Sequence, residues 1–391
     1  MSRLDFSLIF FALLSLACGA ESAELRGTGD LGVIVERAAG SLQIVDTTHR
    51  ARIGQVKELG DLSHATVVYS RDERYAYLFG RDGALTKIDL LNASIVKRLE
   101  QAHNSVGGAI SQDGRLIATS NYTPGGVRIF SAETLEPVAD IRAEYGDGQF
   151  SKVVGLVDAP GQRFVFSLFD AGEIWVAEMK TGTAPGIQKF KAGKQPYDAL
   201  ISPDGRYYIA GLFGEEGLAV LDLWDLQSGV KRILPDFAKT DEKLPVFKMP
   251  HLEGRALVGD HWFLPAIGHH ELWVVDRRSW QIVKRIPLEG QPVFVIARPD
   301  ERQIWVNFAL PDNSQLHVID TRELRVVKKL NPGKAVLHME FTPKGEEIWV
   351  SVRDDDKVVV YDTETFEERA QLSADKPSGI FFTARAHRLG L

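Results

Sequence analysis

Short runs of alternating or continuous apolar residues follow one another from about residue 31 onward, and turns rich in Gly, Pro, Asp and Asn separate them. The three-to-four-residue spacing of apolar positions that marks an amphipathic helix is almost absent. Runs of this length between such turns are typical of β-strands. The pattern therefore predicts an all-β protein built from many short strands.

Two markers repeat along this pattern. Adjacent copies are about 40 to 50 residues apart, the length of one four-stranded blade of a β-propeller. The first marker is a tight turn before an apolar strand, and it begins at Ser70, Ser111, Asp158, Ser202, Arg298 and Thr342. The second is an apolar residue followed by an aspartate, at Asp46, Asp89, Asp222, Asp276, Asp320 and Asp362.

The repeats predict an eight-bladed β-propeller that forms one domain over residues 24–391. The segment 32–59 holds only three strands, and the run 379–383 would supply its missing inner strand. Pairing of the N- and C-terminal strands would then close the ring and leave no open sheet edge between blades. The other seven blades are expected to begin near His64, Gly107, Val153, Tyr197, His251, Val293 and His338.

The N-terminal segment differs from the rest of the chain. Residues 6–16 read FSLIFFALLSL after Arg3, and small residues follow as far as Ala23. A charged start, a short apolar stretch and a small-residue cleavage site are typical of a secretory signal peptide. The stretch is too short for a membrane-spanning helix, which needs about 20 apolar residues. We therefore expect residues 1–23 to be a signal peptide and the protein to be periplasmic.

The only cysteine, Cys18, lies inside this segment. The exported protein is therefore expected to have neither a disulfide nor a cysteine metal ligand. Two interpretations of Cys18 stay open. It is either an ordinary residue of a cleaved peptide or the lipidated residue of a lipoprotein, which would tether the protein to a membrane.

Charge and motifs narrow the function classes. The net charge is −7 with both signs mixed along the chain, and no basic stretch is dense enough to indicate nucleic-acid binding. Neither a phosphate-binding loop, a dinucleotide fingerprint, a metalloprotease motif nor a serine-hydrolase elbow occurs. No haem-attachment motif with two cysteines occurs either, so any haem would be bound without covalent attachment.

The blade order predicts which residues converge on one face. Each inner strand starts at that face, and the loop between the second and third strands returns to it, forming a funnel. The inner-strand starts supply His64, Lys152, Tyr197, Asp198, His251 and His338. The loops supply Arg81, Asp82, Asn121, Tyr122, Asp170, Glu215, Glu216, His269, His270 and Asp354, and a longer connection adds Asp147 and Gln149.

Three histidines of this set are expected at nearly the same depth in different blades. His64, His251 and His338 could bind a metal or ligate a haem iron. The alternative for each of them is a structural hydrogen bond to the backbone at the start of a blade. The sequence pattern alone leaves both interpretations open.

A family resemblance rests mainly on residues 62–90, LSHATVVYSRDERYAYLFGRDGALTKIDL. This stretch resembles the d1 domain of cytochrome cd1 nitrite reductase, in which a histidine at an inner-strand start is followed one hairpin later by a GRDG loop. The matching residues are His64 and the loop 80–83. Residues 121–138 and 337–352 add looser matches. The chain as a whole resembles the related haem d1 biosynthesis proteins of the NirF type.

The resemblance implies that the funnel binds haem d1 or its late precursor, dihydro-haem d1. It makes His64 the axial ligand of the haem iron and Arg81 a partner of the ligand carboxylates. The cofactor-binding set that we predict is His64, Arg81, Asn121, Tyr122, Lys152, His251 and His338. The expected partners are the precursor, cytochrome cd1 nitrite reductase and related maturation proteins, with a homodimer left open.

Two departures from the nitrite reductases suggest that the protein matures haem d1 and does not reduce nitrite. No counterpart of their cytochrome c domain is recognised, and residues 290–294 lack the histidine expected where nitrite is handled. A redox or side-chain-modifying step on the ligand stays open, with Asp147, Tyr122 and His338 as candidate acid–base residues. A metal-dependent hydrolase or lactonase propeller and a non-catalytic interaction scaffold remain as alternatives.

Overall fold

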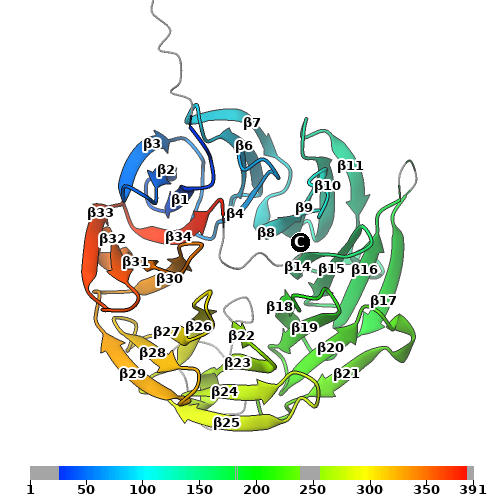
Figure 1. Cartoon of the computed structure of the whole chain (residues 1–391). Helices are drawn as coiled ribbons and strands as arrows, with labels where there is room; N and C mark the ends of the chain where they lie inside the picture. The colour runs from blue at the N-terminus through cyan, green and yellow to red at the C-terminus, as the bar shows by residue number, and fades with distance from the viewer. Residues whose placement is uncertain (1–25, 181, 183, 238–255, 385–391) are drawn as a thin grey trace, which may run out of the picture.

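A computed structural model describes residues 26–180, 182, 184–237 and 256–384, and almost every element in it is a β-strand. Within these residues, eight four-stranded antiparallel sheets stand around one axis in chain order (Figure 1). The predicted eight-bladed propeller is therefore confirmed. The predicted signal segment, Cys18 and His251 lie outside the described residues.

Each blade runs from an inner strand at the axis to an outer strand at the rim. The inner strands of blades one to eight are β34 (Pro377–Phe382), β4 (Thr66–Tyr69), β8 (Asn104–Ile110), β14 (Val153–Ala159), β18 (Pro196–Ile201), β22 (Ala256–Val258), β26 (Pro292–Ala297) and β30 (Val336–Phe341). The second strands are β1 (Leu31–Glu36), β5 (Tyr75–Phe79), β9 (Leu116–Thr123), β15 (Arg163–Leu168), β19 (Tyr207–Leu212), β23 (His261–Ala266), β27 (Gln303–Phe308) and β31 (Glu347–Val352).

The two outer layers follow the same order. The third strands are β2 (Ser41–Asp46), β6 (Ala84–Asp89), β10 (Gly126–Ser131), β16 (Glu173–Glu178), β20 (Leu218–Asp222), β24 (Glu271–Asp276), β28 (Leu316–Asp320) and β32 (Lys357–Asp362). The outer strands are β3 (Ala51–Val56), β7 (Ser94–Glu100), β11 (Pro137–Ile141), β17 (Gly186–Lys191), β21 (Val230–Ile233), β25 (Ile282–Pro287), β29 (Arg325–Leu330) and β33 (Glu368–Ser373).

Pairing of β34 with β1 closes the ring. The two strands are antiparallel, with Gly32 opposite Phe382 and Val33 opposite Phe381. The hydroxyl of Tyr69 in blade two donates to the carbonyl of Phe381 at 2.6 Å, which joins the closing strand to the next blade as well. The expected closure by the two ends of the chain is confirmed.

The first sequence marker is a turn held by its own side chains. In the turn that follows an inner strand, the Ser70 hydroxyl donates to Asp72 and accepts from the N–H of Tyr75. The same contacts recur at Ser111 with Asp113 and at Ser202 with Asp204. Short polar side chains of this kind favour tight turns because they satisfy backbone groups locally.

The second marker, the aspartate after an apolar residue, holds the next turn. Asp89 accepts hydrogen bonds from the N–H groups of Leu91 and Asn92, at 3.0 and 3.2 Å. Asp276, Asp320 and Asp362 accept from the backbone of the turn between third and outer strands in the same way. The aspartates that mark the repeat are thus explained by structure and need no catalytic role.

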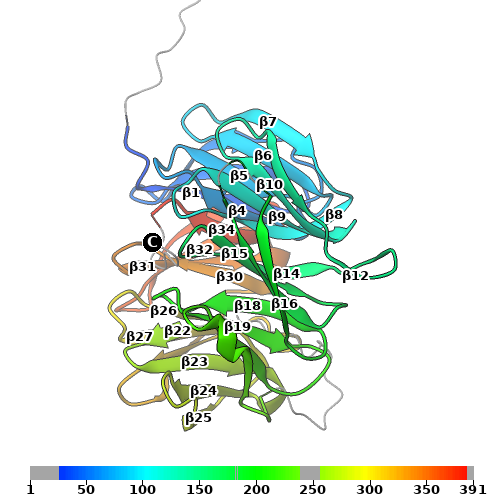
Figure 2. The same ribbon diagram turned by 90° about the vertical axis from the view of Figure 1, so that its right-hand side faces the viewer.

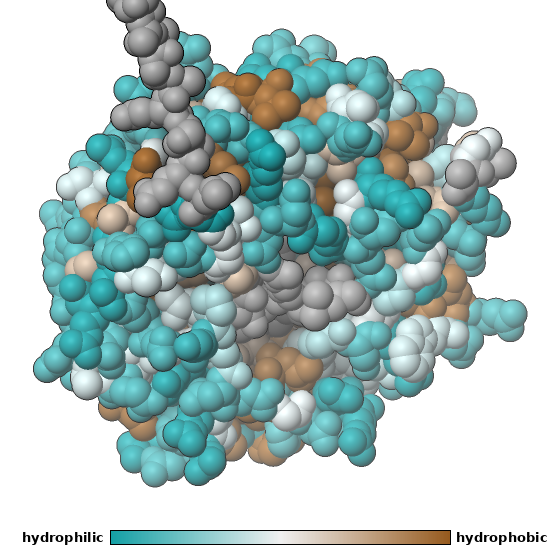
Figure 3. Space-filling model, turned by 45° about the horizontal axis from the view of Figure 1, so that its top comes forward, coloured by the Kyte–Doolittle hydropathy of each residue, from teal (hydrophilic) through white to brown (hydrophobic). Residues whose placement is uncertain are grey.

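Burial follows the position of a strand within its blade. The second and third strands are packed between neighbouring blades and are buried nearly throughout, which explains their continuous apolar runs. The outer strands are largely exposed and carry many Lys and Arg residues, which discourage pairing with other chains. The face seen in Figure 3 is mostly hydrophilic, with separate apolar patches.

Shorter elements complete the fold. A hairpin of β12 (Glu144–Gly146) and β13 (Gln149–Phe150) joins blades three and four and projects from one face of the ring (Figure 2). Three 3-10 turns are η1 (Leu226–Ser228), η2 (Ile267–His269) and η3 (Arg353–Asp355). Among the described residues, no helix has the length and apolar character needed to cross a membrane.

We expect the closing strand to carry a large share of the stability. Phe382 is 1% exposed and packs edge-on against Trp349 of blade eight, with ring centroids 5.5 Å apart. Phe382→Ala should lower the free energy of unfolding by about 3–5 kcal/mol, because it leaves a cavity at the closure. Urea unfolding measures this loss, with Val283→Ala on exposed β25 as the control. Equal midpoints for the two variants would contradict it.

Candidate functional site

The starts of the inner strands and the loops between second and third strands lie on one end of the ring, which we call the top face. His64 precedes β4, and Arg81 lies in the loop between β5 and β6 of the same blade. This loop is the GRDG sequence. Gly83 has a φ of 85°, and a Cβ there would meet the Ala102 carbonyl at 2.3 Å, so only glycine fits.

Asp82 and Asp61 fix Arg81 beside His64. The Asp82 carboxylate accepts from the N–H of Ala84 at 3.1 Å and from the Arg98 guanidinium at 2.7 Å, which holds the loop in place. The Arg81 N–H donates to the Asp61 carbonyl at 2.8 Å. Asp61 in turn accepts from the N–H of Ser63, the residue before His64. The local contacts therefore bring both predicted residues to the same place.

His64 is held toward its neutral form. His64 is an exposed residue, yet protein atoms surround its ring closely enough to displace much of its water. This partial burial lowers the pKa of His64 below its ordinary value, and the positive charges of Arg81 and Arg37 lower it further. A neutral imidazole keeps a ring nitrogen lone pair, which is the form that binds a metal ion.

Arg37 is a residue of this site that the sequence analysis missed. It directly follows β1, in the loop between the second and third strands of blade one. Burial and the like charge of Arg353, which begins η3 in blade eight, lower the pKa of Arg37. Applying the loop rule to blade one, with the closing strand counted as its inner strand, would have found it.

Two guanidinium groups of the top face lack acidic partners. Neither the Arg37 nor the Arg81 side chain forms an ion pair or a hydrogen bond with a described residue, although the Asp61 carboxylate lies within electrostatic reach of both. Arginines nearby are paired: Arg98 contacts Asp82, and Arg353 contacts Asp354 at 2.7 Å. Unpaired guanidinium groups at converging positions are suited to bind carboxylates of a ligand.

Tyr122, another predicted binding residue, lies next to Arg81. The guanidinium carbon is 5.2 Å from the centre of the Tyr122 ring, a cation–π contact. The Tyr122 hydroxyl donates to the Tyr197 hydroxyl of blade five at 3.4 Å. Burial raises the pKa of Tyr122, and the contact with Tyr197 adds to the effect. Tyr122 is therefore a proton donor near neutral pH and not a phenolate.

Asn121, a predicted binding residue, is buried and hydrogen-bonded to Gln101. Its side chain is 1% exposed, and its amide exchanges two hydrogen bonds of 3.0 Å with the amide of Gln101. Both ends of the Asn121 amide are thus used inside the blade. Alternation along β9 places the side chains of Asn121 and Tyr122 on opposite faces of the blade, which explains why the two neighbours have different surroundings.

The predicted Lys152 reaches the top face as part of an ion pair. Its ammonium group is 2.8 Å from a carboxylate oxygen of Asp170 and 4.8 Å from the centre of the Phe169 ring. Its charge is therefore partly compensated, unlike those of Arg37 and Arg81. A ligand carboxylate would have to compete with Asp170 for it.

His338 does not share the depth of His64. Phe341 pairs with Ile348 in the same way as Tyr69 pairs with Ala76, so His338 occupies the position of Thr66, two residues further along its inner strand than His64. Its Nδ1 accepts a hydrogen bond from the N–H of Ile380 at 3.2 Å. The proton of the neutral ring is therefore on Nε2, which makes this nitrogen a donor.

The remaining predicted residues are spread around the top face. Asp147 and Gln149 are exposed on the β12–β13 hairpin. Glu215 pairs with Arg232 at 2.7 Å, and His269 contacts the carbonyl of Asp236 at 2.7 Å. In the described part of the chain, no group of three or more His, Cys, Asp or Glu side chains is arranged to hold a metal ion.

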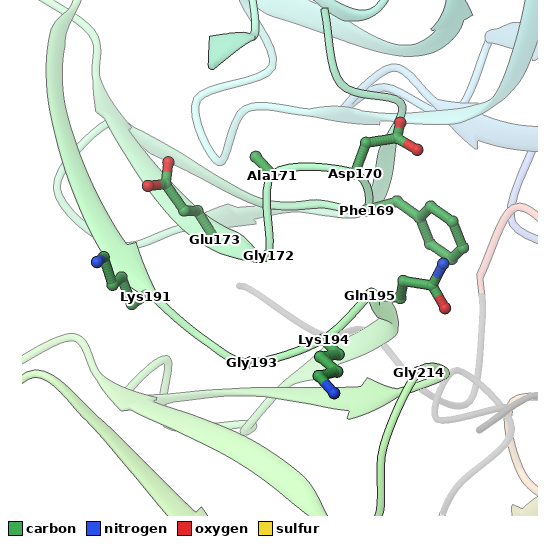
Figure 4. Close-up of a pocket in the computed structure, with 10 residues that line it drawn as sticks. All are labelled: Phe169, Asp170, Ala171, Gly172, Glu173, Lys191, Gly193, Lys194, Gln195 and Gly214. Atoms are coloured by element: carbon green, nitrogen blue, oxygen red, sulfur yellow. The ribbon is translucent and has the colours of Figure 1, made fainter. Parts of the chain in front are cut away.

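Three aromatic rings at the top of blades four and five were also missed as a group. Phe169 and Phe213 directly follow second strands, and Tyr197 lies in inner strand β18. Their ring centroids are 5.9 to 6.0 Å apart. A cavity of about 640 Å³ lies beside them, and Phe169 lines it on the side opposite Lys191 (Figure 4).

The chain is similar to known proteins along almost its whole length. The cytochrome D1 heme domain family matches residues 26–386. Protein NirF of Pseudomonas aeruginosa is 57% identical over 97% of this chain and 98% of its own length, and that of Stutzerimonas stutzeri is 54% identical over 98% and 99%. The solved dihydro-heme d1 dehydrogenase NirN in complex with DHE has a TM-score of 0.81 and 28% identity, over 94% of this chain and 78% of that one.

The charge environment of His64 can be tested without any ligand. Arg81→Gln and Arg37→Gln should each raise the pKa of His64 toward its ordinary value, because each removes a positive charge that disfavours the imidazolium. NMR titration of the ring protons measures the change. Arg115→Gln is the control, since that side chain is 81% exposed and follows the turn after inner strand β8. An unchanged titration in all three variants would contradict the assignment.

Proposed function

The chain belongs to the NirF family of cytochrome d1 haem domain proteins, and from this membership we propose that it acts in haem d1 biosynthesis by binding dihydro-haem d1 at the top face of the propeller. The juxtaposition of a neutral His64 with the guanidinium groups of Arg37 and Arg81, which form no ion pair within the described residues, carries the proposal. The ligand is a late precursor, so the protein receives it as substrate or cargo.

The described residues fit such a ligand. An iron macrocycle with several carboxylates requires an axial nitrogen, cationic partners and apolar walls. His64 supplies a neutral ring nitrogen, and Arg37 and Arg81 approach from two adjacent blades. Tyr122 adds an aromatic surface beside Arg81. Bound here, the iron centre would supply the redox chemistry, and the protein would bind and orient the ring.

If the ligand is converted on the protein, Tyr122 and His338 are the proton donors that we propose. Tyr122 keeps its phenolic proton because burial raises its pKa, and His338 carries its proton on Nε2 because the main chain of β34 occupies Nδ1. Asp147 remains a candidate on the exposed β12–β13 hairpin. The predicted contributions of Lys152 and His251 to binding are also part of this proposal.

The central experiment is an anoxic titration of the protein with dihydro-haem d1, followed by visible absorption. We expect saturable one-to-one binding. Arg37→Gln and Arg81→Gln should each weaken it at least about tenfold, because a charge-assisted hydrogen bond contributes about 1.5 kcal/mol or more. His64→Ala should shift the absorption bands while the carboxylate contacts retain the ligand.

The control for this titration is Arg115→Gln, which should bind as the wild type does. A wild-type protein without affinity for the ligand would overturn the proposed function. Unchanged bands for His64→Ala would remove His64 as the axial ligand and leave the carboxylate site intact. Slow spectral conversion of the bound ligand would identify the protein as an enzyme of the pathway.

We also propose that the protein is periplasmic, on the basis of the apolar segment 6–16 and the small residues after it. Intact-mass analysis decides between the two interpretations of Cys18: a native protein that begins at an acylated Cys18 is tethered to a membrane. A native mass that starts after Ala23 would instead support cleavage without a lipid.

The partners that we propose follow from the role of the family. They are cytochrome cd1 nitrite reductase, which would receive the finished haem, and the related maturation proteins. Affinity capture of the reductase with the ligand-loaded protein tests delivery, and loss of capture with the ligand-free protein is expected. Light scattering in solution decides whether a second copy of the chain is a further partner.

A further inference from the structure

Four aromatic side chains form a continuous strip along the top face, which we call the aromatic belt. Its members are Tyr122 in blade three, Phe169 in blade four and Tyr197 and Phe213 in blade five. The hydroxyls of Tyr122 and Tyr197 are 3.4 Å apart, and the rings of Phe169, Tyr197 and Phe213 contact one another in pairs. The strip therefore spans three blades without a gap.

The belt differs from the aromatic residues that stabilise the fold. Trp273, Trp305 and Trp349 are fully buried between blades, whereas all four members of the belt are only partly buried. Large aromatic side chains that remain accessible and gather at one place indicate a binding surface more often than a core. Each belt residue lies near the end of a strand or in a loop, outside the packed middle of its blade.

The belt also lies beside the cationic side of the top face and not within it. Arg81 contacts Tyr122 at one end of the belt, while the unpaired charges of Arg37 and Arg81 belong to blades one and two. Lys152 contacts Phe169 from outside, but Asp170 already compensates its charge. An amphipathic planar ligand could therefore direct carboxylates to one side and a conjugated ring to the other.

We propose that the aromatic belt is the wall against which one face of the bound macrocycle lies, and that it selects for a broad, flat, conjugated ring. This inference rests on the proposed function, because the macrocycle of that proposal is the ligand. The belt adds a selection that neither His64 nor the arginines provide. An iron ligand and two guanidinium groups recognise a metal and charges, and they do not measure the planarity of a ring.

Backbone constraints support a fixed position of the belt. Gly193, before β18, has a φ of 122°, and a Cβ there would come within 2.1 Å of the Glu215 carboxylate. The Phe213 N–H donates to the Gln195 carbonyl at 2.9 Å, which ties the loop of Phe213 to the segment that carries Tyr197. The rings are thus held by the backbone, as a binding surface for a rigid ligand requires.

The test uses two probes on the full-length protein. One is dihydro-haem d1, and the other is a metal-free porphyrin with uncharged polar substituents, which needs neither His64 nor the arginines. The double variant Phe169→Leu/Phe213→Leu should bind both probes at least about tenfold more weakly, because it removes two ring contacts. Its absorption bands with dihydro-haem d1 should keep the wild-type positions, since His64 is untouched.

Two further variants guard against a trivial loss of folding. Trp224→Leu removes an aromatic ring that is 64% exposed just after β20 and should leave both affinities unchanged. Tyr197→Phe keeps the ring and removes only the hydroxyl contact with Tyr122, so it should retain the uncharged porphyrin. Far-ultraviolet circular dichroism confirms that each variant is folded.

The outcomes separate the belt from the proposed function. Weaker porphyrin binding by the double variant supports the belt even if the wild type fails to bind dihydro-haem d1, a result that would overturn the proposed function alone. Equal affinity of wild type and double variant for either probe that the wild type binds overturns the belt. A wild type that binds neither probe overturns both.

Discussion

Antiparallel pairing between β34 and β1 is the constraint on which the rest of the molecule depends. Without it, blade one has three strands and the ring has two open edges. The pairing also makes β1 a second strand, which turns the loop after it into a top-face loop. Arg37 therefore reaches His64 because the ring closes in this way, and the binding site is a product of the closure.

By comparison, the positions of His64 and Arg81 in blade two depend on contacts between residues that are close in sequence. The GRDG loop, the Asp82 contacts and the hydrogen bond from Arg81 to Asp61 fix Arg81 and His64 from residues within about one blade of sequence. This explains why a short motif could carry so much information. Position 83 must be glycine because of its positive φ, and the aspartate of the motif holds the loop in place. The motif therefore specifies the conformation of the loop as well as the charge of Arg81.

The fold could be predicted from the sequence because each repeat carries its own turn chemistry. Ser70, Asp72 and Asp89 act within a few residues of their partners, so their spacing is visible along the chain. The site was harder to predict. Strand alternation separates the side chain of Tyr122 from that of Asn121, and a register difference separates His338 from His64. Such distinctions depend on the pairing of strands, which a motif of residue types does not specify.

Arg37, Phe169 and Phe213, which the sequence did not reveal, share one position in their blades. Each follows directly on the last residue of a second strand, where the chain leaves the packed blade and reaches the top face. The rings of Phe169 and Phe213 carry no charge that would mark them as binding groups, and the loop of Arg37 is recognisable as a top-face loop only once β34 is counted as the inner strand of blade one. The position after the second strand is therefore the more informative one to compare between blades.

The uneven distribution of charge over the top face has a kinetic consequence. The chain as a whole carries a net charge of −7, so it repels a polyanion, whereas Arg37 and Arg81 attract one toward blades one and two. An approaching ligand is thus turned before it makes contact, and its carboxylate edge arrives first. Screening by salt slows this encounter, while the short-range contacts that govern departure change less. The macrocycle is therefore oriented in solution, before it contacts the protein.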